Sequence, residues 1–146
     1  KAGHQGSTEA LAAYNNAILL ANFSSETLKA ETLYKRGITK RKLGYPAEQS
    51  IPDFQNAIQI IPAHSWAHIM LGEAFFEIDK NLIRAEPEMI AAIRINPNNK
   101  WTYRYLGNLY LRVGKSEEAI KQFERVLEID PDDSHIRNLL MQLTTP

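Results

Sequence analysis

The residues most suited to chemistry are two histidines in the stretch HSWAH. His64 and His68 stand four positions apart, so a helix that held both would present two imidazoles on one face, where they could share a metal ion. His64 closely follows Pro62, before the expected helix start, and no cysteine or third histidine is nearby in the sequence. We therefore interpret His64 as a linker residue and His68 as a packed one, and we expect neither a metal nor a cofactor.

No other set of residues has the pattern of a catalytic site. The sequence contains no GxSxG, no HExxH and no phosphate-binding glycine loop, and it has no cysteine for thiol catalysis or a disulfide. The adjacent acids Glu117 and Glu118 suit the first turn of a helix, where carboxylates interact favourably with the helix dipole. We therefore expect a protein that is not an enzyme.

Charge is distributed unevenly along the chain. The basic stretch KRGITKRK, residues 35–42, is either a solvated helix face or a contact for an anion or acidic peptide, and we favour the solvated face. Residues 1–45 carry seven basic and three acidic groups (net +4), and residues 46–99 carry three and seven (net −4). The whole chain has 17 of each sign, so no global field attracts nucleic acid or an anionic membrane. The local imbalance favours an oriented partner or end-to-end self-association.

Length and composition set the class of protein. With 146 residues, 44% of them hydrophobic, the chain is long enough to form one globular domain with a sizeable core. No apolar run approaches the roughly 18 residues of a membrane span, so we expect no membrane insertion. We expect the chain to be one domain of a larger protein or assembly, and both a cytoplasmic and a periplasmic location are compatible with it.

The elements that position these side chains come from an internal repeat. Gly37, Gly72 and Gly107 are spaced 35 residues apart, and so are Trp66 and Trp101. Around them WAHIMLGEAFFEI matches WTYRYLGNLYLRV, and FQNAIQIIP matches MIAAIRINP and FERVLEIDP. A fixed period of this length is typical of solenoids, in which each unit buries its apolar face against its neighbours.

Each unit has the pattern of two helices. In the last unit, apolar residues recur at helical spacing, a turn follows, and a second apolar stripe with Ser116 as its expected N-cap completes the pair. Pro52 and Pro87 fall near the start of the second helix in the first two units. The sequence favours a bend or irregular first turn there over a late helix start near Ser50 and Ala85.

The last unit resembles the tetratricopeptide repeat. That family's motif is a large residue, Leu-Gly, an aromatic, then Ala, an aromatic, a small residue and Pro over 34 positions. Here the motif is carried by Tyr103, Leu106, Gly107, Tyr110, Ala119, Phe123, Val126 and Pro131. The second unit keeps most of these residues, with one extra residue between its helices. The first unit has Arg36 and Lys40 where Leu and an aromatic are usual.

The resemblance gives the mid-helix glycines an architectural role. A glycine inside a helix costs roughly 0.5–1 kcal/mol relative to alanine. In two-helix repeats of this family the Gly and the small Ala are expected to face one another where the helices cross. The close approach of the two backbones offsets the cost, so we interpret Gly107 as architectural.

The resemblance also implies a binding surface. The first helix of each repeat lines the concave face in this family, through positions counted from the Leu-Gly pair. We name the corresponding positions the groove residues: Tyr34, Lys35, Ile38, Arg41 and Lys42; then Trp66, Ile69, Met70, Glu73, Phe76 and Glu77; then Trp101, Arg104, Tyr105, Asn108, Leu111 and Arg112.

Two tryptophans among the groove residues are the strongest indication of binding. Trp and Tyr anchors with a neighbouring Arg are typical of binding hot spots, and we favour this interpretation over packing of each Trp on the adjoining helix. Chaperone-binding members of the family clamp a carboxylate with Lys, Asn and Arg side chains from successive repeats. Here only Arg104 and Asn108 resemble such a pair, so we expect no carboxylate clamp.

The two ends of the chain differ. Residues 8–21 resemble the second helix of a half repeat and are apolar almost all round, which predicts burial on more than one side. Residues 1–7 are too short and Gly-rich to supply a partner helix, so we expect preceding sequence or a second copy of the chain to cover this edge, through Leu11, Tyr14 and Ile18. Ser24 or Ser25 is the expected N-cap of the next helix. Residues 134–144, with Ser134 as N-cap, have the pattern of a polar capping helix.

The sequence thus predicts an all-α, right-handed superhelical solenoid of antiparallel helix pairs in a single domain. It comprises a half repeat at 8–21, repeats at 30–64, 65–99 and 100–133, and a capping helix at 134–144, about eight helices with no strands. The resemblance implies a non-catalytic module that binds a peptide or partner protein in its concave groove. The alternative is a structural domain that forms homo-oligomers, such as a homodimer through the N-terminal edge.

Overall fold

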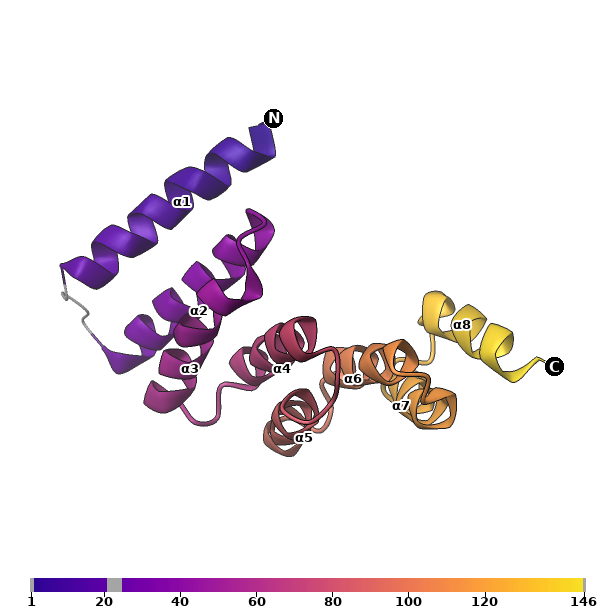
Figure 1. Ribbon diagram of the computed structural model, residues 1–146. Helices are drawn as coiled ribbons and strands as arrows, with labels where there is room; N and C mark the ends of the chain where they lie inside the picture. Colours follow the sequence, from indigo (N-terminus) through magenta and orange to yellow (C-terminus); the bar gives the residue numbers. More distant parts are fainter. Residues whose placement is uncertain (1, 21–24, 146) are drawn as a thin grey trace.

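The computed structural model describes residues 2–20 and 25–145, with side chains from residue 5 on, and it is entirely helical within those ranges (Figure 1). Eight α-helices and one short 3-10 helix follow one another, and the described residues form no strand. This confirms the all-α prediction. The elements are α1 Ala2–Leu19, α2 Glu26–Lys42, η1 Ala47–Gln49, α3 Ile51–Ile60, α4 Ser65–Asp79, α5 Ala85–Ile95, α6 Lys100–Arg112, α7 Ser116–Ile129 and α8 Ser134–Thr144.

Three helix pairs stack along the chain and form a solenoid. The pairs are α2 with α3, α4 with α5, and α6 with α7, and each pair also packs on the next (Figure 1). A continuous buried core runs through them, from Phe54 in the first pair to Val126 in the third. Ile136 of α8 is fully buried at the end of this core. The predicted repeat architecture is therefore confirmed.

The mid-helix glycines make room for rings in two of the three pairs. A Cβ added at Gly37 would lie 2.6 Å from Cε1 of Phe54, and one added at Gly107 would lie 2.6 Å from Cε1 of Phe123. At Gly72 the nearest atoms are the carbonyl oxygen of Ala85 at 3.0 Å and a methionine methyl group. The expected Gly–Ala contact is thus present in the second pair, whereas a phenyl ring fills the crossing in the first and third.

The second helices of the first two pairs begin late. α3 starts at Ile51, with no side-chain cap from Ser50, and α5 starts at Ala85. Pro52 and Pro87 therefore lie in first turns, where a missing N–H leaves no helix bond unmade. The favoured bend is wrong, although a 3-10 turn does precede α3. Ser50 and Ala85 are fully buried, as is Ala119 in the third pair. Ser50 therefore stands in the first repeat at the position that the alanine of the motif, Ala85 or Ala119, has in the other two.

The first pair contains a buried charged cluster in place of part of an apolar core. Asp53 of α3 is fully buried, and both Arg36 and Lys40 of α2 bind it. Nε of Arg36 donates to Oδ1 of Asp53 at 2.9 Å, and Nζ of Lys40 lies 2.8 Å from Oδ2. Arg36 also donates to the Asn15 side chain on α1 at 3.3 Å. The carboxylate of Asp53 thus explains why two basic residues stand at positions that are apolar in the motif.

The helix ends show two further differences from the sequence predictions. Ser25 caps α2 as predicted, with its hydroxyl accepting from the N–H of Leu28, whereas Ser24 lies outside the described residues. Ser116 is the first residue of α7 and no side chain caps that helix. Asp133, one residue before Ser134, caps α8 by accepting from the N–H of Ile136. An aspartate accepts such bonds at least as well as serine.

The N-terminal helix is longer than expected and covered on one side only. It begins at Ala2 instead of near residue 8, and residue 21, the predicted end, lies outside the described residues. Leu11, Tyr14 and Ile18 are half-buried, and Ile18 packs on the cluster that contains Leu33 of α2. None of the described side chains of α1 is buried.

Candidate binding groove

The groove residues all lie on the three consecutive first helices α2, α4 and α6, but they differ in exposure. Ile69 and Phe76 are 0% and 2% exposed, so they support the surface from below and offer a ligand no area. The members that reach solvent most are Lys35, Lys42, Trp66, Trp101, Asn108 and Arg112. Half-buried between them are Tyr34, Ile38, Arg41, Met70, Glu73, Glu77, Arg104, Tyr105 and Leu111.

The basic stretch of α2 divides into three roles. Arg36 and Lys40 are held by Asp53 inside the first repeat and are unavailable to a ligand. Arg41 donates to both oxygens of Glu77 on α4, one of them at 3.2 Å, and thus joins two neighbouring first helices. Only Lys35 and Lys42 of this stretch are exposed.

An acidic and basic cluster lies in the middle of the groove. The hydrogen bond from Arg41 lowers the pKa of Glu77, whereas burial raises the pKa of Glu73 against the opposing effect of Arg112 and Arg41. Arg112 of α6 stacks on the ring of Phe76, with its Cζ 4.3 Å from the ring centroid. Two carboxylates one helical turn apart therefore differ: Glu77 accepts hydrogen bonds from an arginine, and Glu73 accepts none from the described residues.

A pocket of about 420 Å³ opens beside Trp101 on α6. Its lining comprises Trp101, Arg104, Tyr105 and Asn108. Cζ of Arg104 lies 5.3 Å from the centroid of the Trp101 ring, which is 41% exposed. Within the described part of the chain, no hydrogen bond or ion pair engages the Arg104 guanidinium, the Asn108 amide or the Trp101 indole. An aromatic face, a cation and an amide are thus presented together.

The second tryptophan is not part of that pocket. Trp66 begins the first turn of α4 and is 38% exposed, but the lining beside Trp101 does not include it. Near the start of α4 the aromatic contacts come instead from Tyr34. Its ring centroid lies 4.8 Å from that of the His64 imidazole and 6.2 Å from that of the Phe54 ring. Burial raises the pKa of the Tyr34 hydroxyl. No pattern in the sequence indicates the contact between Tyr34 and His64.

Both histidines of HSWAH have structural partners. Nδ1 of His64 accepts from the N–H of Ala67 and caps α4, and Nε2 lies 3.3 Å from a Glu31 oxygen. Nδ1 of His68 is 2.6 Å from Glu88, whose hydrogen bond raises the pKa of His68. No group of three or more His, Cys, Asp or Glu side chains in the described ranges could hold a metal ion. In the same ranges no helix is long and apolar enough to cross a membrane.

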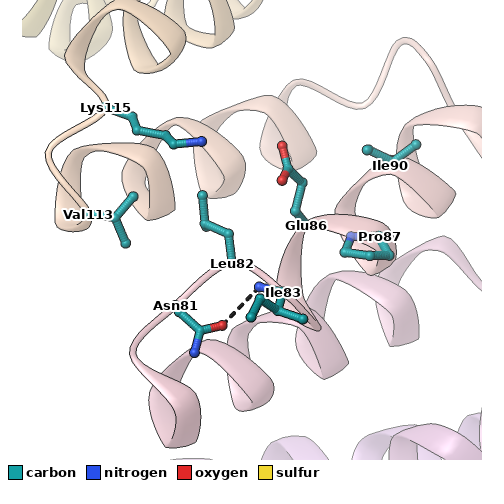
Figure 2. Close-up of a pocket in the computed structure, with 8 residues that line it drawn as sticks. All are labelled: Asn81, Leu82, Ile83, Glu86, Pro87, Ile90, Val113 and Lys115. Atoms are coloured by element: carbon teal, nitrogen blue, oxygen red, sulfur yellow. Dashed lines mark hydrogen bonds between the residues drawn. The ribbon is translucent and has the colours of Figure 1, made fainter.

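A second pocket, of about 490 Å³, lies between the second and third repeats, away from the groove residues (Figure 2). The connector after α4 supplies Asn81, Leu82 and Ile83, and the remaining lining residues are Glu86, Pro87, Ile90, Val113 and Lys115. Two of its polar groups already have internal partners: the Asn81 side chain accepts from the N–H of Ile83, and Glu86 accepts from the hydroxyl of Tyr110. We name it the side pocket. It offers apolar area but fewer unpaired polar groups than the groove.

The comparisons with known proteins agree with this architecture. Residues 101–133 match the family model of the tetratricopeptide repeat. No curated protein sequence matches the chain. Among solved structures, the first TPR of Spaghetti (RPAP3) bound to an HSP90 peptide, SRMEEVD, is 25% identical with a TM-score of 0.72, over 81% of this chain and 92% of that one.

Two further structures share the fold. The TPR domain of Arabidopsis OM64 is 19% identical with a TM-score of 0.72, over 82% of this chain and 97% of that one. The crystal structure of MamA is 24% identical with a TM-score of 0.78, over 98% of this chain and 74% of that one. Residues 101–133 therefore form a tetratricopeptide repeat, and the described residues have the all-α fold of a TPR-like solenoid.

Proposed function

We propose that the protein binds a peptide or a segment of a partner protein along the groove residues, across the second and third repeats, without catalysis. The observation that carries this proposal is the group of Trp101, Arg104 and Asn108 beside an open pocket. Exposed aromatic and guanidinium groups in one place are the usual anchors of protein interfaces. Apolar or aromatic side chains of the segment would occupy this end, and an acidic end would lie toward Lys35, Lys42 and Arg41.

The comparison with Spaghetti supports a peptide as the ligand. That domain, at 25% identity over most of this chain, is bound to a peptide with several acidic residues. The carboxylate-clamp residues of chaperone-binding members are mostly missing here, since Ile38, Ile69 and Glu73 stand where polar or basic residues would be needed. The proposed ligand, an extended or helical peptide, therefore depends on other anchors.

The groove is tested by selecting binders from a random peptide library and measuring their affinity for variants. Trp101→Ala and Trp66→Ala should each weaken binding by about 2 kcal/mol or more if both are hot spots. Ile83→Ala is the matched control, because Ile83 is 80% exposed in the side pocket and its loss should leave affinity unchanged. If both tryptophan variants keep a native circular dichroism spectrum and bind as tightly as the wild type, the tryptophans are scaffold only.

A second candidate function, self-association through the N-terminal edge, is favoured by the exposure of α1. Leu19 and Leu20 are 81% and 76% exposed at the end of that helix, an unusual loss of apolar burial. Leu11 and Tyr14, which we expected at the interface, are half-buried. In this alternative a second copy covers the outer side of α1, as in a two-fold dimer.

Sedimentation of three proteins tests the alternative. Leu19→Glu with Leu20→Glu changes only exposed side chains, whereas Leu11→Glu with Tyr14→Glu also perturbs packing on the next helix. A wild type that dimerises and a Leu19→Glu, Leu20→Glu variant that stays monomeric would support the dimer. A wild type that is monomeric at high concentration would rule it out.

A further inference from the structure

Part of the second repeat presents aliphatic side chains to solvent. Ile83, Pro87 and Ile90 follow one another at spacings of four and three residues, from the connector before α5 into the helix. All three are exposed, Ile83 by 80% and Ile90 by 45%. We name them the apolar stripe. They border the side pocket, where Leu82 and Val113 add to the apolar lining (Figure 2).

The other two repeats have exposed polar side chains where the second repeat has Ile83 and Ile90. Positions are matched by counting from the buried small residue near the start of each second helix, which is Ala85 in the second repeat. The matched residues are Glu48 and Glu117 for Ile83, and Gln55 and Glu124 for Ile90. Since both neighbouring repeats fold with polar groups there, the repeat architecture does not account for the two isoleucines. Exposed apolar groups gathered in one place are typical of interaction sites.

Most polar groups around the side pocket are engaged by the protein itself. The Asn81 side chain accepts from the N–H of Ile83 and donates to the carbonyl oxygen of Asp79 at 3.1 Å. The Glu86 carboxylate accepts from the hydroxyl of Tyr110. An extended segment placed here would leave backbone N–H and C=O groups against aliphatic side chains without partners, whereas a helix satisfies its own backbone. The side pocket therefore suits the apolar face of a helix.

Lys115 differs from these polar groups because its charge has no acidic partner in the described part of the chain. It extends from the turn after α6, on the Val113 side of the pocket, and is exposed (Figure 2). Its Nζ lies 5.8 Å from the centroid of the Tyr110 ring. Glu86, the acid that lines the pocket, is already bonded to Tyr110. A carboxylate of a ligand at this rim would therefore give Lys115 a charged partner.

We propose that the side pocket is a second docking site, which binds an amphipathic helix of a partner protein. Aliphatic side chains of that helix pack on the apolar stripe and on Val113, and an acidic residue beside them pairs with Lys115. The lining of the side pocket shares no residue with the groove. The site is thus independent of the proposed peptide-binding function. Burial of Ile83 and Ile90 supplies the affinity, and the pair with Lys115 sets the orientation of the helix.

Selection from a library of helical peptides tests this site. The selection uses the Trp101→Ala variant, so that an anchor of the groove is missing. Selected peptides should carry Leu, Ile or Val three or four residues apart on one face, with Asp or Glu beside them. The double variant Ile83→Glu, Ile90→Glu has the acids of the third repeat at these positions and should keep a native circular dichroism spectrum. It should bind the tightest peptide about tenfold more weakly or worse, because two buried aliphatic groups are lost.

The charge is tested separately with Lys115→Gln. This variant should bind the same peptide about threefold more weakly, and a peptide with Gln in place of its acid should not distinguish it from Lys115. Gln55→Glu is the matched control, because Gln55 has the position of Ile90 in the first repeat, and it should keep full affinity. A library without binders, or equal affinity for the double variant, would overturn the docking site. Equal affinity for Lys115→Gln would overturn the acidic partner.

Discussion

The first and third repeats share one helix crossing and surround it with opposite chemistry. In both, a phenylalanine ring of the second helix packs on a glycine of the first helix. The three ring atoms nearest to a Cβ added at that glycine lie at the same distances in the two repeats. Beside that crossing the third repeat has Leu106 and Tyr110, whereas the first repeat has Arg36 and Lys40, which bind the buried Asp53. The crossing therefore does not depend on apolar neighbours.

The difference shows which contacts of the repeat are geometric and which are replaceable. The ring must fill the space above the glycine, because a side chain on either Gly would collide with it. The positions beside the crossing can be filled in two ways: by apolar side chains that pack together, or by charged side chains that pair and form hydrogen bonds. The charged version also ties α1 to the first repeat, through the bond from Arg36 to Asn15.

The largest effect should come from breaking the charged cluster. Asp53→Ala leaves two cations largely buried and unpaired, so we expect a loss of about 3 kcal/mol in the free energy of unfolding. The corresponding change in the third repeat, Gln122→Ala, removes no such partner and should cost under about 0.5 kcal/mol. Urea denaturation of both variants measures the contrast, and equal losses would contradict it.

Converting the first repeat to the chemistry of the third sharpens the same comparison. The triple change Arg36→Leu, Lys40→Tyr and Asp53→Gln replaces the ion cluster by the residues of the third repeat. Because well-packed apolar groups often replace buried ion pairs without loss, the triple variant should recover at least about 2 kcal/mol relative to Asp53→Ala. Denaturation midpoints test this, and a triple variant less stable than Asp53→Ala would show that the repeat needs its charges.

Adding one methyl group at the crossing should have a smaller effect, equal in the two repeats. Gly37→Ala and Gly107→Ala force a phenyl ring to move, which costs about 1–3 kcal/mol, partly offset by the better helix propensity of alanine. Gly72→Ala should cost less, because the flexible end of Met89 can yield, although the Ala85 carbonyl is also close. Thermal unfolding of the three variants decides it, and a loss at Gly72 exceeding the other two would refute the ranking.

The smallest effect concerns the two groove glutamates and depends on pH. Because burial raises the pKa of Glu73 in the folded state, its charge destabilises the fold at neutral pH, and Glu73→Gln should stabilise by about 0.5 kcal/mol at pH 7. The gain should vanish as the pH falls below the ordinary pKa of glutamate. Glu77, whose pKa is lowered by Arg41, should show the opposite sign, a small loss on Glu77→Gln at neutral pH. Denaturation at several pH values checks both signs.

The sequence was sufficient for the repeat and the helix count, because these follow from a period that recurs in glycines, tryptophans and apolar stripes. It was insufficient for contacts between repeats. Asp53 as the partner of Arg36 and Lys40 is set by helix packing, and no local pattern encodes it. The pair of Arg41 and Glu77 had a weak signal, since the two residues are separated by about one repeat.

The groove residues lie on the predicted first helices, and their binding role stays a prediction. A helix presents some of its positions to the core and others to the surface, and the family positions alone did not show that Ile69 and Phe76 are buried. The late helix starts, at Ile51 and Ala85, were the less favoured alternative because a proline in a first turn and one that bends a helix look the same in the sequence. The buried small-residue role of Ser50 was not predicted, since a serine stands where the other repeats have alanine.

Nuclear magnetic resonance of the ¹⁵N-labelled protein, titrated with the tightest selected peptide, tests the groove function most directly. The two indole N–H signals distinguish Trp66 from Trp101, and backbone signals report on every helix. We predict the largest shift changes along α2, α4 and α6, with the Trp101 indole among them. Changes confined to α1, or to the side pocket around Ile83 and Ile90, with the groove signals unmoved, would contradict it.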